Sequence, residues 1–593
     1  MPKYLDKDGL GYFWEKIKDH SAVKNAYSYG FKPSNSASDN VTAMQALLDD
    51  AGIIMITVPG VYSVNAKMKI RSNTYLYFGP GVQIRLTARS DYVFINEGAF
   101  NNTTTENIVI DGYYIDTNNI ATNASIYGLR GYLSFFHVKN LTIRNVRCDF
   151  YPAHVFFLHV CDFENVSISG CRLIGDKDAM HFSKGSNLTI RDCTVCSVDD
   201  AIALNAWDFA ESNPEIGDIT DVSIENIREL DHSKNTASVY PNTLGYTIRM
   251  LNGAWLNWSS GMTVQHSTTV IHNDYMYRCV NLSGGQSKTS TVAPSSSRGE
   301  SEVGSDEIEW KNCGLYSAKS STVKNVSIRD VVSYQTKHVA YISFNSINES
   351  DHKSWVSGAT FDPVDDVLID GFTQYGEAPA FIEVSGDVRH FEIVNSNLDS
   401  SKLSNGIIKI EQQFSNADFN DFYAFFDKNV VYGSHLIMTY TSGNSVTRTG
   451  CVAFGMNRPK GRNFTFSANC PVDGVGSNTP IITQSITGTN GNMFYCKQQD
   501  FIYLYISGGS GFSSGGQSWT PVGTLPLNYR PLYDYYTPIN GGSYGGTYHG
   551  QLRVLTTGEV AVAFPTESSG SVNYIVGSAL FPSQNPFSQA ISH

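Results

Sequence analysis

Asn165-Val-Ser-Ile-Ser-Gly170 and Asn187-Leu-Thr-Ile-Arg-Asp192 are two copies of one six-residue phrase that decides the fold of this chain. The pattern is Asn or Asp, an apolar residue, any residue, Ile, any residue, and then Asn, Asp or Gly. Alternation of apolar and polar residues is typical of a strand with one buried face. The phrase starts again at Asn107, Asn140, Asp221, Asn325, Asp366 and His390.

The spacing of the phrase predicts a solenoid. The starts at residues 165 and 187 are 22 residues apart, those at 366 and 390 are 24 apart, and those at 140 and 165 are 25 apart. Such a return is one coil of a few short strands, and successive coils pair in parallel about 4.8 Å apart. We therefore predict an all-β fold built on a right-handed parallel β-helix. A strand-rich β-sandwich is the alternative.

The register of the phrase can be tested on the sixth residue after each start. These residues are all apolar, as an inward stack demands: Val146, Cys171, Cys193, Ile227, Val331 and Phe372. The stack explains two of the ten cysteines as core residues. Cys193 and Cys196 form a C-x-x-C pair, but no second pair completes a zinc site. We therefore expect buried thiols and no metal or cofactor.

The net charge and the hydropathy of the chain indicate which classes of partner are disfavoured. The chain has 593 residues and a net charge of −13, which disfavours nucleic acid and anionic membranes as partners. No apolar run is long enough to span a membrane, so we expect no membrane insertion. The start, Met1-Pro-Lys-Tyr-Leu-Asp6, lacks the apolar core of a signal peptide.

Three regions follow from the patterns along the chain. Residues 1–23 read as a helix, a possible virion attachment. Residues 24–440 read as the β-helix, with a helical cap and first coil in 24–80. Residues 283–306 read as a surface loop within it. Residues 441–593, with short Gly-, Ser- and aromatic-rich strands, read as a C-terminal β-sandwich of jelly-roll type.

Aligning the coils places polar residues in two columns. The first column is His154, Asp178, Asp200 and Tyr246, and the second is Phe157, His181, Ala203 and Arg249. With Asp199, three carboxyls gather on neighbouring coils, where like charges raise one another's pKa. A proton donor beside an ionised partner suits glycosidic cleavage. Side chains splaying from the coil edge would reach the roughly 6.5–9.5 Å that an inverting pair needs.

The same stretch resembles the polygalacturonase family of glycoside hydrolases over residues 100–260. Asp176-Lys-Asp178-Ala179 corresponds to its Asn-Thr-Asp-Gly, Val198-Asp-Asp200 to its Gly-Asp-Asp, and Arg249-Met-Leu251 in part to its Arg-Ile-Lys. The resemblance implies that Asp199 is the general acid, that Asp178 and Asp200 hold and activate water, and that Arg249 binds the sugar. His154, His181 and Tyr246 are further candidate sugar-binding residues.

Two departures from that family bear on the substrate. Its Gly-His-Gly motif is absent, with His232 near the place but without flanking glycines, and Leu251 replaces the Lys that would hold a uronate. We therefore expect a neutral or amino sugar, or a site that binds without cutting. The recurrence of Asp-Asp at Asp365-Asp366 leaves open that the dipeptide is turn chemistry.

The tail of the chain resembles C-terminal domains of phage tail and receptor-binding proteins. The resemblance rests on three stretches, Gly523-Thr-Leu-Pro-Leu-Asn-Tyr-Arg-Pro531, Arg553-Val-Leu-Thr-Thr-Gly-Glu-Val560 and Tyr574-Ile-Val-Gly-Ser578, and on the opening Tyr4-Leu-Asp-Lys-Asp-Gly-Leu10. It implies a homotrimeric tail spike of the virion that contacts phage tail or baseplate proteins and a bacterial surface polysaccharide.

Three functions remain open at this point. The first is a tail-spike hydrolase that depolymerises a surface glycan, with inversion. The second is a receptor-binding protein on the same fold that adheres without cutting. The third, a polysaccharide lyase, ranks lowest, because such enzymes use Ca²⁺ or a basic residue and Lys177 is the only Lys on the acidic face. The fold alone hosts all three.

Overall fold

The computed structural model describes residues 23–232, 237–238, 245–282, 286–315, 321–334, 342–345, 360–378, 380–385 and 390–403, and shorter stretches between 408 and 582. The helix predicted at residues 1–23 lies outside these ranges, apart from Val23. The chain divides into two compact units, one mainly of residues 1–419 and one mainly of residues 466–593. None of the described helices is long and apolar enough to cross a membrane.

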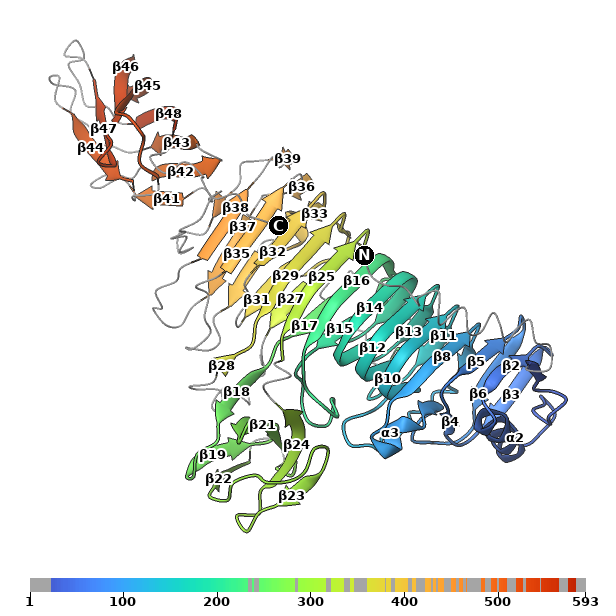
Figure 1. Ribbon diagram of the computed structural model, residues 1–593. Coiled ribbons are helices and arrows are strands. Elements are labelled where there is room, and N and C mark those ends of the chain that lie inside the picture. Colours follow the sequence, from blue (N-terminus) through green and yellow to red (C-terminus); the bar gives the residue numbers. More distant parts are fainter. Residues whose placement is uncertain are drawn as a thin grey trace. The chain divides into compact units, whose positions relative to one another are not determined.

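The first unit is a coil whose strands pair in parallel along three rows, which run side by side in Figure 1. The row that carries the phrase consists of β2 (Gly52–Ile56), β5 (Thr74–Phe78), β8 (Thr105–Asp111), β10 (Leu133–Arg144), β12 (Leu158–Ser169), β14 (Met180–Ser197), β16 (Ile219–Glu229), β25 (Val323–Arg329), β29 (Val364–Asp370) and β32 (His390–Val394). This pairing confirms the predicted right-handed parallel β-helix.

The second and third rows use shorter strands, together with the ends of the long strands β10, β12, β14 and β16. The second row has β3 (Gly60–Val64), β6 (Val82–Leu86), β9 (Tyr114–Asp116), β11 (Arg147–Tyr151), β13 (Arg172–Gly175), β26 (Val332–Ser333), β30 (Thr373–Gln374) and β33 (Asn397–Asp399). The third has β4 (Met68–Ile70), β7 (Phe94–Asn96), β15 (Ile202–Asn205), β17 (Ile248–Leu251), β27 (Ile342–Asn345), β31 (Ile382–Ser385) and β34 (Ile408–Glu411).

The Ile of the phrase forms a single column through the core. Ile110, Ile143, Ile168, Ile190, Ile224, Ile328, Ile369 and Ile393 are successive partners in register, and all are buried. The predicted inward stack from Val146 to Phe372 is buried as well. Cys171, Cys193 and Cys196 are among the buried free thiols of the described residues. Burial of one apolar column per coil is the main stabilisation of the fold.

The backbone explains why each phrase begins and ends with Asn, Asp or Gly. The first residue has a φ of 51° to 59° in the seven copies from Asn107 to Asp366. The sixth residue is also left-handed, as in Asn145 (56°), Gly170 (65°) and Asp192 (57°). Gly adopts this conformation without cost and Asn or Asp more readily than other residues. The chain turns between sheets at these positions, so the phrase marks the corners of the coil.

The first residues also form a ladder of side-chain amides between coils. The Nδ2 of Asn165 donates to Oδ1 of Asn140 at 3.0 Å, and the Nδ2 of Asn187 donates to Oδ1 of Asn165 at 3.1 Å. Asn107 and Asn73 continue the ladder toward the N-terminus. Each amide is thus both donor and acceptor, which satisfies polar groups at a partly buried corner.

Replacement of Asn165 separates these two effects. Asn165→Ala loses the ladder and forces a Cβ residue into the left-handed region, so we expect the free energy of unfolding to fall by about 1–3 kcal/mol. Asn165→Gly loses only the ladder and should cost about 0.5–1.5 kcal/mol. Denaturant unfolding of both variants checks this. Equal losses in the two variants would show that backbone strain contributes nothing.

A helix covers the first coils, as predicted. α2 (Ala37–Asp49) begins at Ser36, whose Oγ accepts a hydrogen bond from the amide of Asp39 at 3.2 Å. Its own Met44, Leu47 and Leu48 are buried. The helix thereby closes the apolar end of the solenoid, as a terminal repeat must.

The interpretation of residues 283–306 as a surface loop is wrong in part. Between β17 and β25 the chain forms a small, largely antiparallel domain, visible beside the coil in Figure 1. Its strands are β18 (Ala254–Asn257), β19 (Met262–Gln265), β20 (Thr269–His272), β21 (Tyr275–Cys279), β22 (Ser287–Ser290), β23 (Ser301–Val303) and β24 (Glu309–Leu315). A separate apolar cluster around Val270, Tyr277 and Trp310 stabilises these strands. Because the strands are short and polar, their sequence shows no alternating pattern that would have predicted them.

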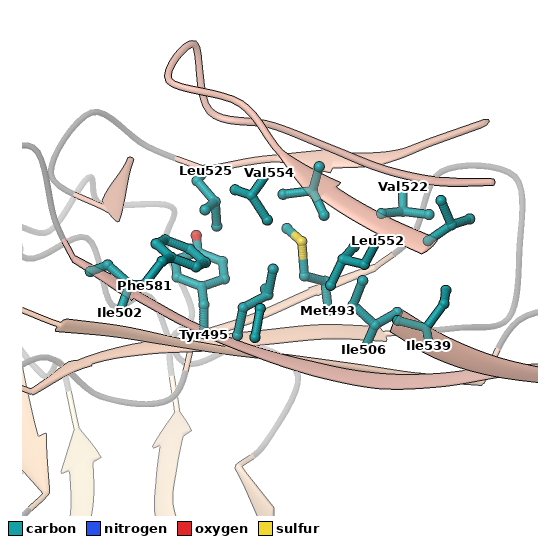
Figure 2. Packing of buried hydrophobic residues seen from close by; sticks show 14 of the residues in the cluster. Met493, Tyr495, Ile502, Ile506, Val522, Leu525, Ile539, Leu552, Val554 and Phe581 are labelled. Atoms are coloured by element: carbon teal, nitrogen blue, oxygen red, sulfur yellow. The ribbon is translucent and has the colours of Figure 1, made fainter. Parts of the chain in front are cut away.

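The second unit is an antiparallel sheet folded over its own core. Its strands are β41 (Ile482–Ser485), β42 (Asn492–Gln498), β43 (Phe501–Gly508), β44 (Thr520–Thr524), β45 (Tyr535–Ser543), β46 (Gly546–Val554), β47 (Glu559–Ala563) and β48 (Tyr574–Pro582). Figure 2 shows two layers, with Val522, Leu525 and Val554 of one facing Met493, Tyr495 and Ile506 of the other. This arrangement agrees with the predicted C-terminal β-sandwich.

Candidate functional site

The three predicted aspartates lie at the edge of the third row of strands. Asp178 precedes β14, and Asp199 and Asp200 precede β15. The amide of Ala179 donates to the carbonyl of Asp200 at 3.1 Å, and the amide of Ala201 donates to the carbonyl of Tyr246 at 2.8 Å. Asp178, Asp200 and Tyr246 therefore stack on successive coils, as predicted.

The first member of each predicted column is wrong. His181 pairs with His159, not Phe157, and the amide of Phe157 donates to the carbonyl of Asp178, so Phe156 takes the place predicted for His154. The coil is longer here, because a bulge follows Cys148 and additional residues form the turn before β12. His154 lies in that exposed turn with a φ of 73°. The rest of the second predicted column is confirmed, because His181, Ala203 and Arg249 are successive partners in register.

The side chains of the three aspartates converge. One carboxylate oxygen from each of Asp178, Asp199 and Asp200 lies within 4.8 Å of the others. Asp178 and Asp200 are 2% exposed, whereas the Asp199 side chain is 26% exposed. The expectation that these side chains splay apart to 6.5–9.5 Å is therefore wrong. Asp199 is the member that a ligand at the surface meets first.

Two cations flank the three carboxyls, which we call the trio. Lys177 hydrogen-bonds Asp199 and lies 3.8 Å from Oδ1 of Asp178. A guanidinium nitrogen of Arg249 lies 3.5 Å from Oδ2 of Asp200, and the same guanidinium lies 5.2 Å from the centre of the Tyr246 ring. Two positive charges against three carboxyls leave one negative charge, which a single proton on the trio balances.

Of the three carboxyls, Asp200 has the surroundings that most favour its protonated form. Burial raises the pKa of Asp200 well above its ordinary value, and the neighbouring Asp199 and Asp178 raise it further against the opposing effect of Arg249. Burial also works to raise the pKa of Asp178, but Lys177, His181 and Arg249 outweigh it and hold that pKa below its ordinary value. The trio thus combines a carboxyl with a raised pKa and a carboxyl with a lowered pKa, the division that acid–base catalysis uses.

His181 is held in one orientation beside Asp178. Its Nδ1 lies 2.7 Å from Oδ2 of Asp178, and its ring stacks on Phe156 at 4.1 Å with planes 6° apart. Its Nε2 lies 3.7 Å from Asp208, whose carboxylate accepts a hydrogen bond from Asn205 at 2.7 Å. Phe156, Asp208 and Asn205 were not among the predicted site residues. Of these three residues, only Asn205 could have been found from the sequence, because it is the one polar residue at the end of the apolar stretch Ile202-Ala-Leu-Asn205.

Two buried oxygens of the trio have no hydrogen-bond partner among the described residues. They are Oδ1 of Asp178 and Oδ1 of Asp200. Buried polar atoms are nearly always hydrogen-bonded to protein or to water, so each oxygen can accept from a water molecule or a sugar hydroxyl. A water with its two hydrogens on these oxygens would sit within the trio.

The trio also has the oxygen ligands that a hard cation such as Ca²⁺ prefers. Lys177 and Arg249 already supply positive charge at these oxygens, so a divalent cation would meet repulsion there. The residues present therefore fit a proton better than a metal ion.

The two buried aspartates should respond to pH with opposite signs. Between the unfolded pKa and its raised native pKa, Asp200 binds more protons in the native state, so its contribution to stability is lost as pH rises. Asp178, with its lowered pKa, contributes stability that is lost as pH falls. Relative to the parent, Asp200→Asn should gain thermal stability as the pH rises from 4 to 8. The deficit of Asp178→Asn should be constant above about pH 5 and shrink as the pH falls below about 4. Melting temperatures from pH 2 to 8 check the prediction, and the same trend in both variants would contradict it.

Comparisons with known proteins give similar structures but no related sequence. No family model matches the chain, and no curated protein matches it. A hyperthermoactive exopolygalacturonase from Thermotoga maritima is 11% identical, over 77% of this chain and 97% of its own, with a TM-score of 0.45. The tailspike protein of Escherichia coli bacteriophage HK620, solved with a hexasaccharide, is 10% identical over 94% of each chain, with a TM-score of 0.44.

A third similar structure is a surface adhesin of Streptococcus pneumoniae, 12% identical over 80% of this chain and 96% of its own, with a TM-score of 0.38. These scores are low, so the fold assignment rests on the strand pairing of this chain itself. By that pairing the chain is a right-handed parallel β-helix protein, and the solved structures that it resembles include phage tailspike proteins and an exopolygalacturonase.

Proposed function

We propose that this protein is a phage tail spike that binds and hydrolyses a bacterial cell-surface polysaccharide at the trio. The observation that carries the proposal is the convergence of three carboxyls within 4.8 Å, with a raised pKa at Asp200 and a lowered pKa at Asp178. Such a division supplies an acid and a base in one place.

Each member of the trio has a role in the proposed reaction. On substrate binding a proton passes from Asp200 to Asp199 within the trio, and Asp199, the exposed member, gives it to the leaving glycosidic oxygen. Asp178 and Asp200, then both ionised, hold a water through their unpartnered oxygens. As the glycosidic bond breaks, the water oxygen bonds to the anomeric carbon and one water proton passes to Asp200, which restores the starting state of the trio. Arg249 stabilises the charge on Asp200, and Lys177 keeps Asp178 ionised.

The substrate in this proposal is a neutral or amino-sugar glycan. Leu251 stands where a uronate-binding family member has Lys, and it is buried, so it offers no cation to a carboxylated sugar. Lys177 is itself bound to Asp199. Arg249, His181, Tyr246 and His154 remain the proposed sugar-binding residues, of which the first three lie at the trio.

Release of reducing sugar from a panel of purified bacterial surface polysaccharides tests the activity. We expect release from neutral or amino-sugar glycans and less from uronate-rich ones. Release of an unsaturated product that absorbs near 235 nm would indicate a lyase instead. Binding to a glycan with no release from any member of the panel would support the adhesion function.

The anomeric configuration of the product tests the water-holding role separately. We expect inversion, because a water held on Asp178 and Asp200 attacks in a single displacement. The oxygens of the trio lie within 4.8 Å of one another, which is nearer the roughly 5–5.5 Å of retaining enzymes than the spacing of inverting ones. The product configuration therefore distinguishes the two mechanisms. Proton NMR of the first product formed shows which configuration it has. Retention would mean that a trio aspartate is a nucleophile, with hydrolysis itself intact.

Adhesion without cleavage is the second candidate function. The burial of Asp178 and Asp200 favours it, because only Asp199 of the trio is appreciably open to a glycan. In either case we propose a homotrimer on the virion that contacts phage tail or baseplate proteins. Residues 1–23 would attach it and residues 441–593 would trimerise or bind the receptor. Light scattering of the purified protein measures the oligomeric state.

A further inference from the structure

A row of outward side chains alternates in charge along the coil. Successive partners in the phrase row are Glu106, Lys139, Glu164, Ser186, Thr220, Lys324 and Asp365. Lys139 and Glu164 pair at 3.0 Å, and Lys324 and Asp365 pair at 3.7 Å. Opposite charges on neighbouring coils attract, so the row stabilises the stack. Ser186 and Thr220 interrupt it with two short hydroxyl side chains.

A hollow of about 410 Å³ lies at this interruption, across β10, β12, β14 and β16, which are neighbours in Figure 1. Ser186, Thr220, Glu164 and Lys139 line it. Gly185, also in its lining, is pressed against the ring of Phe163, where a Cβ would come within 2.4 Å of the ring atoms. The short side chains of Ser186 and Thr220 therefore leave the space, and Gly185 allows the Phe163 ring to pack beside it.

Buried charged groups form the inner part of the hollow. The ammonium of Lys184, whose side chain is 5% exposed, hydrogen-bonds Glu215 and lies 3.0 Å from Asp162. The Nδ1 of His137 lies 2.5 Å from the same Asp162. Such a network holds its polar atoms in fixed positions, so the inner wall is formed before any ligand arrives.

The chemistry of the lining selects a neutral, hydroxyl-rich ligand. Carboxylates accept hydrogen bonds from hydroxyls, ammonium groups donate to them, and Ser and Thr do both. The three acidic residues Asp162, Glu164 and Asp218 oppose an anion, and Lys139 and Lys184 oppose a cation. The volume falls within the range of small-molecule pockets.

We propose that this hollow is a saccharide-binding site, distinct from the trio, for a neutral or N-acetylated sugar unit. Asp178 and Lys184 lie six residues apart on one extended segment, about 20 Å at the rise of a β-strand. The hollow, at Lys184 to Ser186 within β14, and Asp178 of the trio, just before that strand, are therefore separate places on the same coil. Sugar binding here does not require the trio to be catalytic.

Saturation-transfer difference NMR on the full chain tests the proposal with three probes: glucose, N-acetylglucosamine and glucuronate. Ser186→Tyr places a ring in the hollow, and Ser223→Tyr places the same ring on a half-buried serine of β16 that does not line the hollow. From titrations of the transfer signal, we expect Ser186→Tyr to raise the Kd for glucose and N-acetylglucosamine about tenfold, a loss of about 1.4 kcal/mol, and Ser223→Tyr to leave the Kd within about twofold. Glucuronate should show the weakest transfer.

Two further outcomes separate this site from the trio. Asp199→Asn should retain the sugar signal whether or not it abolishes cleavage. A signal lost in Asp199→Asn but kept in Ser186→Tyr would place the sugar at the trio and overturn the proposal. Equal signals in the parent and Ser186→Tyr, or the strongest transfer to glucuronate, would also overturn it. Absence of cleavage by the parent leaves this result unaffected.

Discussion

Asp199→Asn should bind the surface glycan as the parent does and release reducing ends about 10²–10⁴-fold more slowly, the usual contribution of a general acid or base. The amide that replaces the carboxyl would carry no proton to the leaving oxygen. The change would also release Lys177, which lies 3.8 Å from Asp178 in the parent and would then bind that carboxylate more closely. Initial rates on a glycan that the parent cleaves, with binding measured in parallel, check the prediction.

The chain offers a matched control for this variant in a second Asp-Asp pair. Asp365 lies at an ordinary corner of the coil, 3.7 Å from Lys324, and is not part of the trio. Asp365→Asn makes the same chemical change beside a similar cation and should leave the rate unchanged. If both variants cleave at the parental rate, the trio is not catalytic and adhesion becomes the function.

Gly245→Ala should reduce the rate of cleavage about 10²-fold although it alters no member of the trio, because misplacing a reacting group by about 1 Å costs that much. A Cβ on Gly245 would lie 1.9 Å from the carbonyl oxygen of Asp199 and 2.7 Å from its Cα. The backbone of Asp199 must therefore move, and Asp200 moves with it. Overpacking of this kind also lowers stability by about 1–3 kcal/mol.

Gly261→Ala separates displacement of the site from the general cost of replacing glycine. A Cβ there meets nothing within 4 Å, but the residue has a φ of 93°. The variant should lose about 1–2 kcal/mol of stability and keep its full rate. Rate constants and melting temperatures of Gly245→Ala and Gly261→Ala, measured side by side, test both predictions. A fully active Gly245→Ala would show that the position of the Asp199 backbone does not limit the reaction.

The sequence predicted the coil because the phrase carries both of its physical requirements. The alternation buries one Ile per coil, and Asn, Asp or Gly at each end tolerates the left-handed backbone of the corners. Both requirements are local, so they can be read from neighbouring residues. The inserted antiparallel domain is held by non-local contacts such as those of Tyr277 and Trp310, and for that reason its polar strands read as a loop.

The site was predictable in part for the same reason. The stacking of Asp178, Asp200 and Tyr246, and the partnership of His181 with Arg249 through Ala203, follow from the coil register. His154 was misplaced, since a bulge and a longer turn in one coil shift the alignment without changing the apolar pattern.

By itself, then, the sequence determined the parallel β-helix, its helical cap and the gathering of three aspartates, because each depends on residue type at a repeating interval. Only the tertiary structure decided that their oxygens converge within 4.8 Å and that Asp200 is the member with the raised pKa. It also decided that a gap in a charge ladder leaves a hollow. These properties depend on burial and on the distances between side chains, which come from coils packed together and from no single stretch of the chain.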